Sequence, residues 1–354
     1  MPVYYNKNGN PFGRSKNSEK LTAYPVGRTF LWENQEVLIP AVYTGKSGAI
    51  LDICIKIPLE DMILFLKKWN KDRRLSLHTQ EEYEQMETDN PCCIDFEADM
   101  YFDDIPLKQR MRSSLMWYPK EVFYLEDDDA LSPAAQSADL QEEDEAEIPA
   151  ADAYSNDRDA EKLMKTYDLN RSFCWYFGRL VYRWQTKALL SPGKIALTLK
   201  AEPKSITVSH FTTDLSCSKQ TVKITHPATG QKYLLTLHEC KETKLPLSDF
   251  GEKNMLYPRY CHQLFYSVSP RPECNLLDIR DCDDGDSPRK ADAADNILSE
   301  SCGPTAIFAA GRSGCLDKSI AFSSLRFQPV PKIRWRVVFW IKPREDAKIS
   351  FTIG

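Results

Sequence analysis

The stretch Ile195-Ala-Leu-Thr-Leu-Lys200, followed by Ser205-Ile-Thr-Val-Ser-His210, decides the fold class of this chain. Apolar and polar residues alternate in both segments, and that period belongs to a strand with one face buried and one face in water. A short segment that contains Pro203 separates them, as expected for a turn between two strands. The pattern predicts antiparallel β-sheets.

The same signal recurs outward from this stretch in both directions. Further strands are predicted over residues 28–32, 36–43, 49–57, 173–184, 222–224, 233–240, 260–268, 276–279, 320–327, 333–341 and 348–353. Many short strands separated by frequent turns are typical of a sandwich. We therefore expect a mainly β protein, a β-rich α+β fold built as an antiparallel β-sandwich with a few short helices.

Two short helices are expected before residue 125. Pro58 precedes a segment, 59–70, in which apolar residues recur at helical spacing, and proline is favoured where a helix begins. A second helix is expected after Thr79, because Thr79 and Glu82 have the spacing of a capping box.

The charge of the chain is divided unevenly. The whole chain has a net charge of −5, but residues 125–161 contain 14 acids and one base, a net charge of −13. The remainder therefore carries +8. The middle of this segment has few aromatic or β-branched residues and cannot bury enough surface to offset ordering entropy, so we expect a disordered acidic insertion. It is interpreted as a solubilising linker, or alternatively as a polyanion that covers a basic surface of the same protein.

This segment divides the chain into three expected parts. Residues 1–124 hold β-hairpin strands and two short helices, 125–161 the acidic segment, and 162–354 an antiparallel β-sandwich with a flexible loop near 282–300. A single hairpin is marginally stable alone, so we expect the early strands to pack on the later sheets.

Composition limits the classes of protein. Apolar residues make up 42% and charged residues 27%, as in a chain that buries a core. The first residues lack the apolar core of a signal peptide, and the longest apolar stretches, such as 337–341, are too short to span a bilayer. The 11 cysteines are an odd, scattered set. We expect a cytoplasmic protein with reduced thiols and no membrane association.

The best candidate metal ligands are His238 and Cys240. They lie two apart on the predicted strand 234–240, hence on one face. Zinc requires four such ligands in a structural site, and the remaining ones could come from a set of further residues: His210, His226, Cys261, Cys274 and Cys282. The chain lacks the Cys-x-x-Cys pair that is usual in structural zinc sites. We therefore expect no metal, with a structural zinc as the alternative.

Other motifs are weaker. Gly45-Lys46-Ser47 lacks the first glycine of a phosphate loop and precedes a strand. Gly311, Arg312, Ser313 and Gly314 could form an anion-binding turn, with a plain turn as the alternative. Cys261 and His262 resemble a nucleophile beside its base, but neighbours on a strand point to opposite faces. The acidic residues around Gly285 do not have the spacing of a calcium loop.

Three segments carry a resemblance to known sequences. Residues 257–262 (Tyr-Pro-Arg-Tyr-Cys-His), 278–282 (Asp-Ile-Arg-Asp-Cys) and 333–339 (Ile-Arg-Trp-Arg-Val-Val-Phe) are similar to parts of uncharacterised proteins from anaerobic gut Firmicutes. The resemblance covers mostly the part after residue 200. It implies a bacterial protein in a reduced cytosol and carries no activity with it.

These observations favour a non-enzymatic binding module that contacts a protein partner through a sheet face, a strand edge or its loops. A zinc- or cysteine-dependent hydrolase built around His238 and Cys240 is the second hypothesis. The third is a binder of nucleic acid or another polyanion that is masked by the acidic segment.

Overall fold

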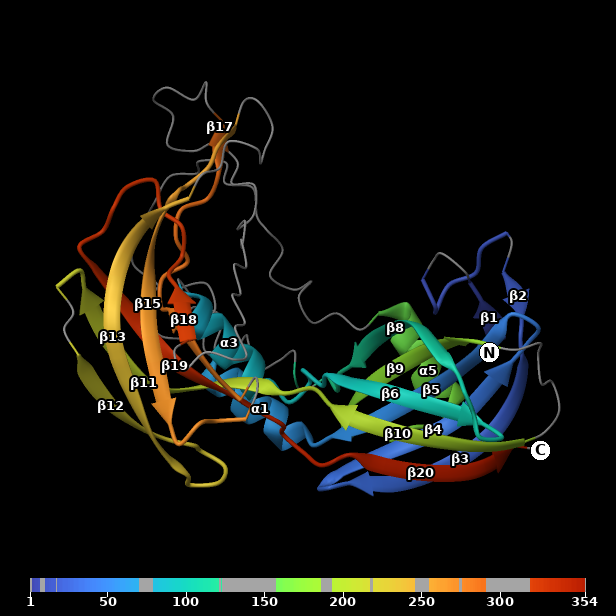
Figure 1. Ribbon diagram of the computed structural model, residues 1–354. Helices are drawn as coiled ribbons and strands as arrows, with labels where there is room; N and C mark the ends of the chain where they lie inside the picture. The colour runs from blue at the N-terminus through green and yellow to red at the C-terminus, as the bar shows by residue number, and fades with distance from the viewer. Residues whose placement is uncertain are drawn as a thin grey trace, which may run out of the picture. The chain divides into compact units, whose positions relative to one another are not determined.

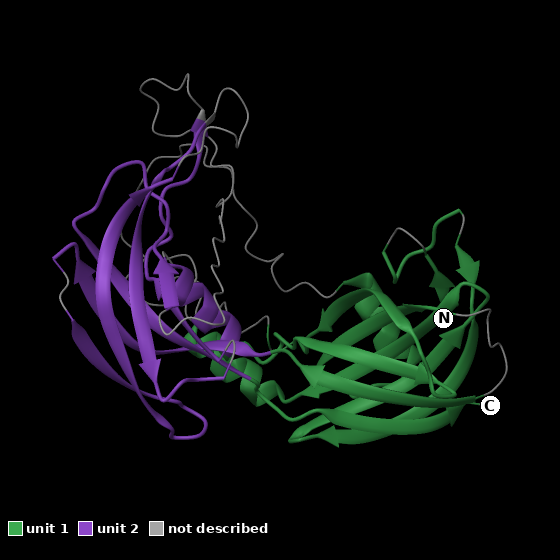
Figure 2. Ribbon diagram, in the orientation of Figure 1, with its two compact units in different colours: residues 1–76, 89–202, 342–354 green, residues 77–88, 203–341 purple. Residues whose placement is uncertain are grey.

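The structure is a computed structural model, and it is mainly β, as expected. It describes residues 2–6, 10–16, 18–69, 79–120, 122, 157–185, 193–216, 219–245, 255–273, 276–290 and 319–353. Every ladder between two strands in these ranges is antiparallel (Figure 1). The chain forms two compact units (Figure 2).

Unit 1 comprises residues 1–76, 89–202 and 342–354. Its larger sheet has the order β3-β4-β5-β9-β8, with β3 (Thr22–Trp32), β4 (Gln35–Thr44), β5 (Gly48–Ile57), β9 (Cys174–Arg183) and β8 (Lys108–Trp117). Its smaller sheet has the order β20-β10-β6-β7, with β20 (Ala347–Ile353), β10 (Gly193–Ala201), β6 (Phe96–Phe102) and β7 (Ile105–Pro106). Two short strands, β1 (Tyr4–Tyr5) and β2 (Glu19–Lys20), form a separate pair.

The two sheets of unit 1 pack against each other. The Tyr182 hydroxyl on β9 donates to the carbonyl of Ala98 on β6 at 2.9 Å. The rings of Trp32 and Phe96 meet edge to face, with centroids 5.8 Å apart. Strand β5 is buried along nearly all of its length, which explains why residues 49–57 form an apolar run with little alternation.

The two predicted helices are present. Helix α1 (Leu59–Lys68) follows Pro58 and buries Met62, Phe65 and Leu66. Helix α3 (Gln80–Asp89) begins with the expected capping box. The Thr79 amide donates to a Glu82 carboxylate oxygen at 3.1 Å, and the Glu82 amide donates to the Thr79 hydroxyl at 3.2 Å.

A third helix, α5 (Arg158–Thr166), was not predicted. The interpretation of residues 125–161 as one unstructured acidic segment is wrong at its C-terminal end. Asp157 accepts a hydrogen bond from the Asp159 amide at 2.7 Å and caps the helix. Ala160, Leu163 and Met164 then pack into the core of unit 1. Residues 125–156 lie outside the described residues.

Unit 2 comprises residues 77–88 and 203–341. One sheet has the order β11-β19-β16, with β11 (Lys204–Asp214), β19 (Lys332–Ile341) and β16 (Leu277–Asp281). The other has the order β12-β13-β15-β18, with β12 (Gln220–Thr225), β13 (Lys232–Lys244), β15 (Tyr260–Ser269) and β18 (Ser319–Phe322). The short strands β14 (Met255–Leu256) and β17 (Arg289–Lys290) pair with each other.

A single apolar core joins the two sheets of unit 2. Trp335, Val337 and Phe339 from β19 contribute to it, and so do Leu235 and Leu264 from the facing sheet. These five side chains are fully buried. Unit 2 is therefore a sandwich, as the alternation in its strands predicts.

The boundary between the units differs from the expected one. We expected residues 162–354 to form one sandwich, but β9, β10 and β20 belong to unit 1. The reason lies in long-range pairing: β9 lies between β5 and β8, and β10 between β6 and β20. The early strands thus join later strands within unit 1. Of the loop expected near 282–300, residues 282–290 are described, and they include β17.

No helix in the described part of the chain combines the length and apolar character needed to cross a membrane.

Candidate functional site

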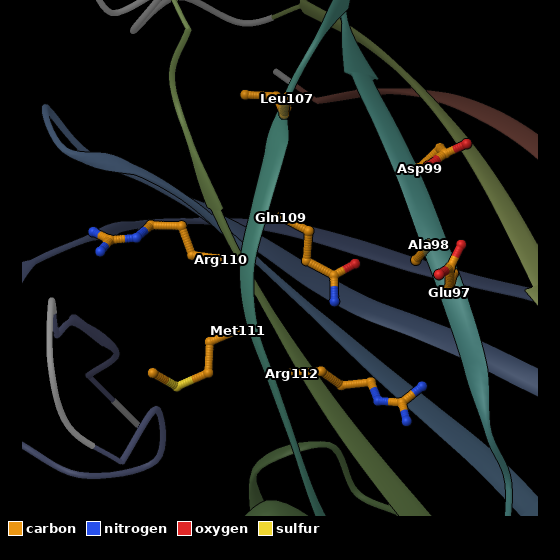
Figure 3. Close-up of a pocket in the computed structure, with 8 residues that line it drawn as sticks. All are labelled: Glu97, Ala98, Asp99, Leu107, Gln109, Arg110, Met111 and Arg112. Carbon is orange, nitrogen blue, oxygen red and sulfur yellow. The ribbon is translucent and has the colours of Figure 1, made fainter. Parts of the chain in front are cut away.

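A pocket of about 390 Å³ lies between β6 and β8 in unit 1 (Figure 3). Strand β6 contributes one wall, and Leu107 with the first half of β8 contributes the other. The lining residues are Glu97, Ala98, Asp99, Leu107, Gln109, Arg110, Met111 and Arg112. We call this pocket the edge groove, because β8 is the last strand of its sheet and β6 is covered by the terminal strand β7 only at one end.

Both strands of the edge groove have backbone edges that no described strand fills. Strand β8 pairs with β9 on one side, and no described strand pairs with its other side. Strand β6 pairs with β10 along its length, and with β7 at Tyr101 and Phe102 alone. On the β6 edge the carbonyls of Phe96, Ala98 and Met100 already accept hydrogen bonds from Arg112, Tyr182 and Leu107. The backbone groups that can pair with a further strand are therefore those of β8.

A β-bulge sets the direction of the side chains on β8. The pairing of β8 with β9 shifts register between Gln109 and Met111, so Arg110 is the extra residue. Gln109 and Arg112 point toward β6, whereas Arg110 and Met111 point away from it (Figure 3). The bulge thereby places one amide and one guanidinium on the groove side of β8.

The charges of the groove are partly neutralised within unit 1. The Arg112 guanidinium donates to the Phe96 carbonyl and to Asp95 at 3.0 Å, and it lies 3.6 Å from Glu202. Lys200 pairs with Asp99 at 2.5 Å. The carboxylate of Glu97 is exposed and forms no ion pair with a described residue. The β6 wall therefore offers a free negative charge.

A second polar cluster in unit 1 is built around a buried ion pair. Arg179 donates to both oxygens of Asp52, at 2.7 and 2.6 Å, and these side chains are 1% and 4% exposed. The Tyr167 hydroxyl donates to Asp52 and lies 2.9 Å from the Tyr43 hydroxyl. Arg179 also donates to the carbonyl of Pro11 at 3.2 Å. We interpret Arg179 and Asp52 as a structural pair, since both side chains are almost fully buried.

The outer face of the three-stranded sheet in unit 2 carries a row of basic side chains. His210 on β11 and Arg280 on β16 both lie opposite Arg336 on the central strand β19. Helix α3 covers this row. Glu84 accepts from Arg336 at 2.9 and 3.2 Å and from Arg280 at 2.9 Å, while Glu81 lies 2.9 Å from His210. None of the residues of α3 is buried, so polar contacts hold the helix in place.

The ion pairs that Glu84 forms with Arg336 and Arg280 should depend on pH. Burial raises the pKa of the Glu84 carboxyl, but hydrogen bonding to Arg336 and the charges of Arg336 and Arg280 outweigh it, so the pKa lies below the ordinary 4.5. A group whose pKa is lowered on folding stabilises the fold above its unfolded pKa and loses that effect as pH falls through the folded value. Arg336, Arg280 and the nearby Asp278 complete the charged groups around it.

We therefore expect acid to loosen α3. Below pH 4.5, amide hydrogen exchange of residues 80–89, corrected for intrinsic rates, should rise relative to exchange of β13 in the same unit. A Glu84→Gln variant should show no such additional rise, because it has no charge to lose. An equal pH dependence in both proteins would contradict this assignment.

The predicted metal pair His238 and Cys240 does not share a face, so that prediction is wrong. The pairing of β13 with β15 shifts register between Leu237 and Glu239, which makes His238 a bulge residue. Beyond the bulge the alternation changes phase. Cys240 therefore enters the core beside Leu237, whereas His238 lies 2.9 Å from Ser267 on the other face.

Cys240 instead meets a different histidine. Its Sγ lies 3.5 Å from Nδ1 of His262, and the Thr213 hydroxyl donates to the same sulfur at 3.4 Å. His262 Nε2 has no hydrogen-bond partner among the described residues. Cys240 and His262 are 4% and 2% exposed, so a substrate cannot reach this pair. His262 is next to Cys261, as the sequence shows, but its partner comes from another strand.

The remaining predicted sites fall into two groups. Gly311, Arg312, Ser313 and Gly314 lie outside the described residues, so the anion-binding turn stays a prediction. The acidic residues near Gly285 bind protein groups. Asp281 accepts from the Ser324 amide at 3.0 Å, and Asp286 from the Phe327 amide at 2.6 Å.

The described cysteines behave as small buried side chains. All seven are free thiols, and six of them are buried. Burial raises the pKa of Cys174 to about 12 and that of Cys282 to about 11. A thiol with so high a pKa is protonated at neutral pH and is a poor nucleophile.

Sequence reasoning missed the residues of the edge groove, because no strand was predicted between 90 and 120. The signal for β6 was present: Phe96, Ala98, Met100 and Phe102 alternate with polar residues and are all buried. The signal for β8 was weaker, since its residues are mostly half-buried and its bulge breaks the alternation.

Comparisons with family models, with curated proteins and with solved structures return no match for this chain. The resemblance to proteins of anaerobic Firmicutes and the cytoplasmic location therefore stay predictions.

Proposed function

We propose that the protein is a non-enzymatic binding module that takes up an extended polypeptide segment in the edge groove of unit 1. The segment pairs with the edge of β8 that no described strand covers and places a basic side chain beside Glu97. Such strand addition combines backbone hydrogen bonds, which supply affinity, with side-chain contacts that supply specificity.

The observation that carries this proposal is the pocket between two strand edges that no described strand fills. A long exposed edge is an aggregation hazard that proteins usually block with bulges, charges or short strands. Strand β8 spans ten residues, Lys108–Trp117, and has a single bulge near one end. The bulge and the basic residues lie in the first half of β8, and no described strand covers its second half, residues 113–117, which is a reason to expect a partner strand there.

The hydrolase alternative has lost its main support, because His238 and Cys240 lie on opposite faces and the Cys240–His262 pair is enclosed. The polyanion hypothesis has no new support either. The basic row on the outer face of unit 2 is already paired with Glu81 and Glu84 of α3. We therefore propose peptide binding alone.

A random peptide display library, selected on the full-length chain, provides the test. Selected peptides should bind in extended form and slow hydrogen exchange in β8 and β6. Glu97→Lys should weaken their binding by about tenfold or more, since a like charge then faces the basic side chain of the peptide.

Glu60→Lys, at an exposed position of α1, is the matched control and should leave the affinity unchanged. Peptides that bind the Glu97→Lys variant as tightly as the unchanged protein would show that the groove is not the site. Failure to select any peptide would count against peptide binding altogether.

A further inference from the structure

Three side chains of different chemistry converge at one end of α3 in unit 2. Glu81 lies in the first turn of α3, His210 lies on β11, and Cys282 is the residue that follows β16. One donor atom from each lies within 4.8 Å of the donor atoms of the other two. Nε2 of His210 is 2.9 Å from each carboxylate oxygen of Glu81.

The sheet brings His210 and Cys282 to the same face. Phe211 and Ile279 belong to the core, so alternation places His210, Arg280 and Cys282 on the outer face. Strands β11 and β16 flank β19, and the Cys282 amide continues the ladder by donating to the Arg334 carbonyl at 2.9 Å. The two side chains therefore approach each other above the central strand.

Helix α3 supplies the third group from above this face. Glu81 and Glu84 lie three residues apart, and that spacing puts both carboxylates on the side of the helix that meets the sheet. Glu84 holds this side by binding Arg336, Arg280 and Ser205. The Gln80 amide donates to Asp284 at 3.1 Å, which fixes the start of the helix near Cys282.

An imidazole, a carboxylate and a thiolate are ligands that zinc accepts together. Zinc binds nitrogen and oxygen at about 2.0–2.2 Å and sulfur at about 2.3 Å, so tetrahedral ligand atoms are about 3.3–3.7 Å apart. The observed spacing, 2.9 Å for one pair and no more than 4.8 Å for the others, requires only side-chain adjustments to reach these values. Calcium and magnesium prefer sets of oxygen atoms alone, which a cysteine does not provide.

We propose that Glu81, His210 and Cys282 bind a zinc ion that fastens α3 to the outer face of the three-stranded sheet in unit 2. The fourth position belongs to water, which reaches the site past Glu81 and His210, whose side chains are 27% and 35% exposed. Zinc binds Cys282 as a thiolate, so the thiol proton leaves when the ion enters. The ion would bridge Glu81 and His210 in place of their direct contact. Its bond to Cys282 would add a second link between α3 and the sheet.

The full-length protein, stripped with a chelator and dialysed, is the material for the test. Titration with zinc chloride should show one ion bound per chain, and Co²⁺ should give the visible absorption of a tetrahedral site with a thiolate charge-transfer band. His210→Ala and Cys282→Ser should each weaken zinc binding by about tenfold or more. Cys282→Ser should also abolish the thiolate band.

Two variants of the same residue types serve as controls. His238→Ala and Cys261→Ser lie in unit 2 but outside the cluster, so both should bind zinc and Co²⁺ as the unchanged protein does. Circular dichroism separates loss of ligand from loss of fold. Glu81→Gln, at a half-exposed position, keeps the shape of the side chain and should weaken binding even if the cysteine variant does not fold.

A second measurement reports on the stability of α3. Zinc should slow hydrogen exchange of residues 80–89 in the unchanged protein and leave it unaffected in His210→Ala. The proposal would be overturned if the stripped protein bound no zinc, or if His210→Ala, Cys282→Ser and Glu81→Gln all bound it as tightly as the unchanged protein.

Discussion

Replacement of Arg179 by methionine is expected to destabilise unit 1 by about 3–5 kcal/mol. Arg179 and Asp52 face each other across β5 and β9, and both are almost fully buried. Removal of the guanidinium leaves the Asp52 carboxylate in the core with only the Tyr167 hydroxyl as a described side-chain partner. An unpaired buried charge costs more free energy than the intact pair contributes.

Hydrogen exchange of β5 and β9 measures this effect in unit 1 separately from unit 2. Arg183→Met, an exposed arginine on the same strand, is the matched control and should change stability by no more than about 0.5 kcal/mol. The double variant Asp52→Leu with Arg179→Met should be more stable than Arg179→Met alone, because it removes both charges. A loss below about 1 kcal/mol in Arg179→Met would refute the role of the pair.

Replacement of Glu84 by glutamine should detach α3 from unit 2. Arg336 is 2% exposed, and Glu84 is the carboxylate with which it forms its ion pair. The neutral amide leaves the charge of Arg336 uncompensated under the helix and weakens the contact with Arg280 as well. We expect a loss on the order of 2–3 kcal/mol.

Exchange of the α3 amides, residues 80–89, is the measurement, with Glu87→Gln as the control on the exposed side of the same helix. The control should leave exchange within error of the unchanged protein. Because α3 buries no residue of its own, little apolar packing would hold it after the substitution. Unchanged exchange in Glu84→Gln would show that other contacts hold the helix.

Both predictions concern buried ion pairs. In each case the sequence points to one charged partner but does not identify the other. Asp52 stands out as the single acid in the apolar run 49–57, which indicates that a buried strand needs a cation nearby. Nothing local identifies that cation as Arg179, which lies 127 residues further along the chain. Similarly, Arg334 and Arg336 alternate with the buried Ile333, Trp335 and Val337, a pattern typical of a half-buried strand, and nothing local indicates that Arg336 is buried beneath a helix.

The candidate sites, too, could be predicted from the sequence only in part. His210 and Cys282 were among the residues that could converge on a metal, but the acid that completes their group, Glu81, is on a helix more than a hundred residues away in sequence. The expected pair His238 and Cys240 failed for a local reason. Its two-residue spacing assumes a regular strand, and a single bulge at His238 sends the two side chains to opposite faces.

By itself, the sequence determined the class of fold, because the alternation of residues in β10, β11, β13 and β19 depends on which face of each strand is buried. It also determined the two helices with local start signals, Pro58 and the Thr79–Glu82 box. Only the tertiary structure decided which strands pair, where the chain divides into units, and which strand edges no described strand covers. Those outcomes depend on contacts between residues far apart in the chain, and neither periodicity nor capping carries information about such contacts.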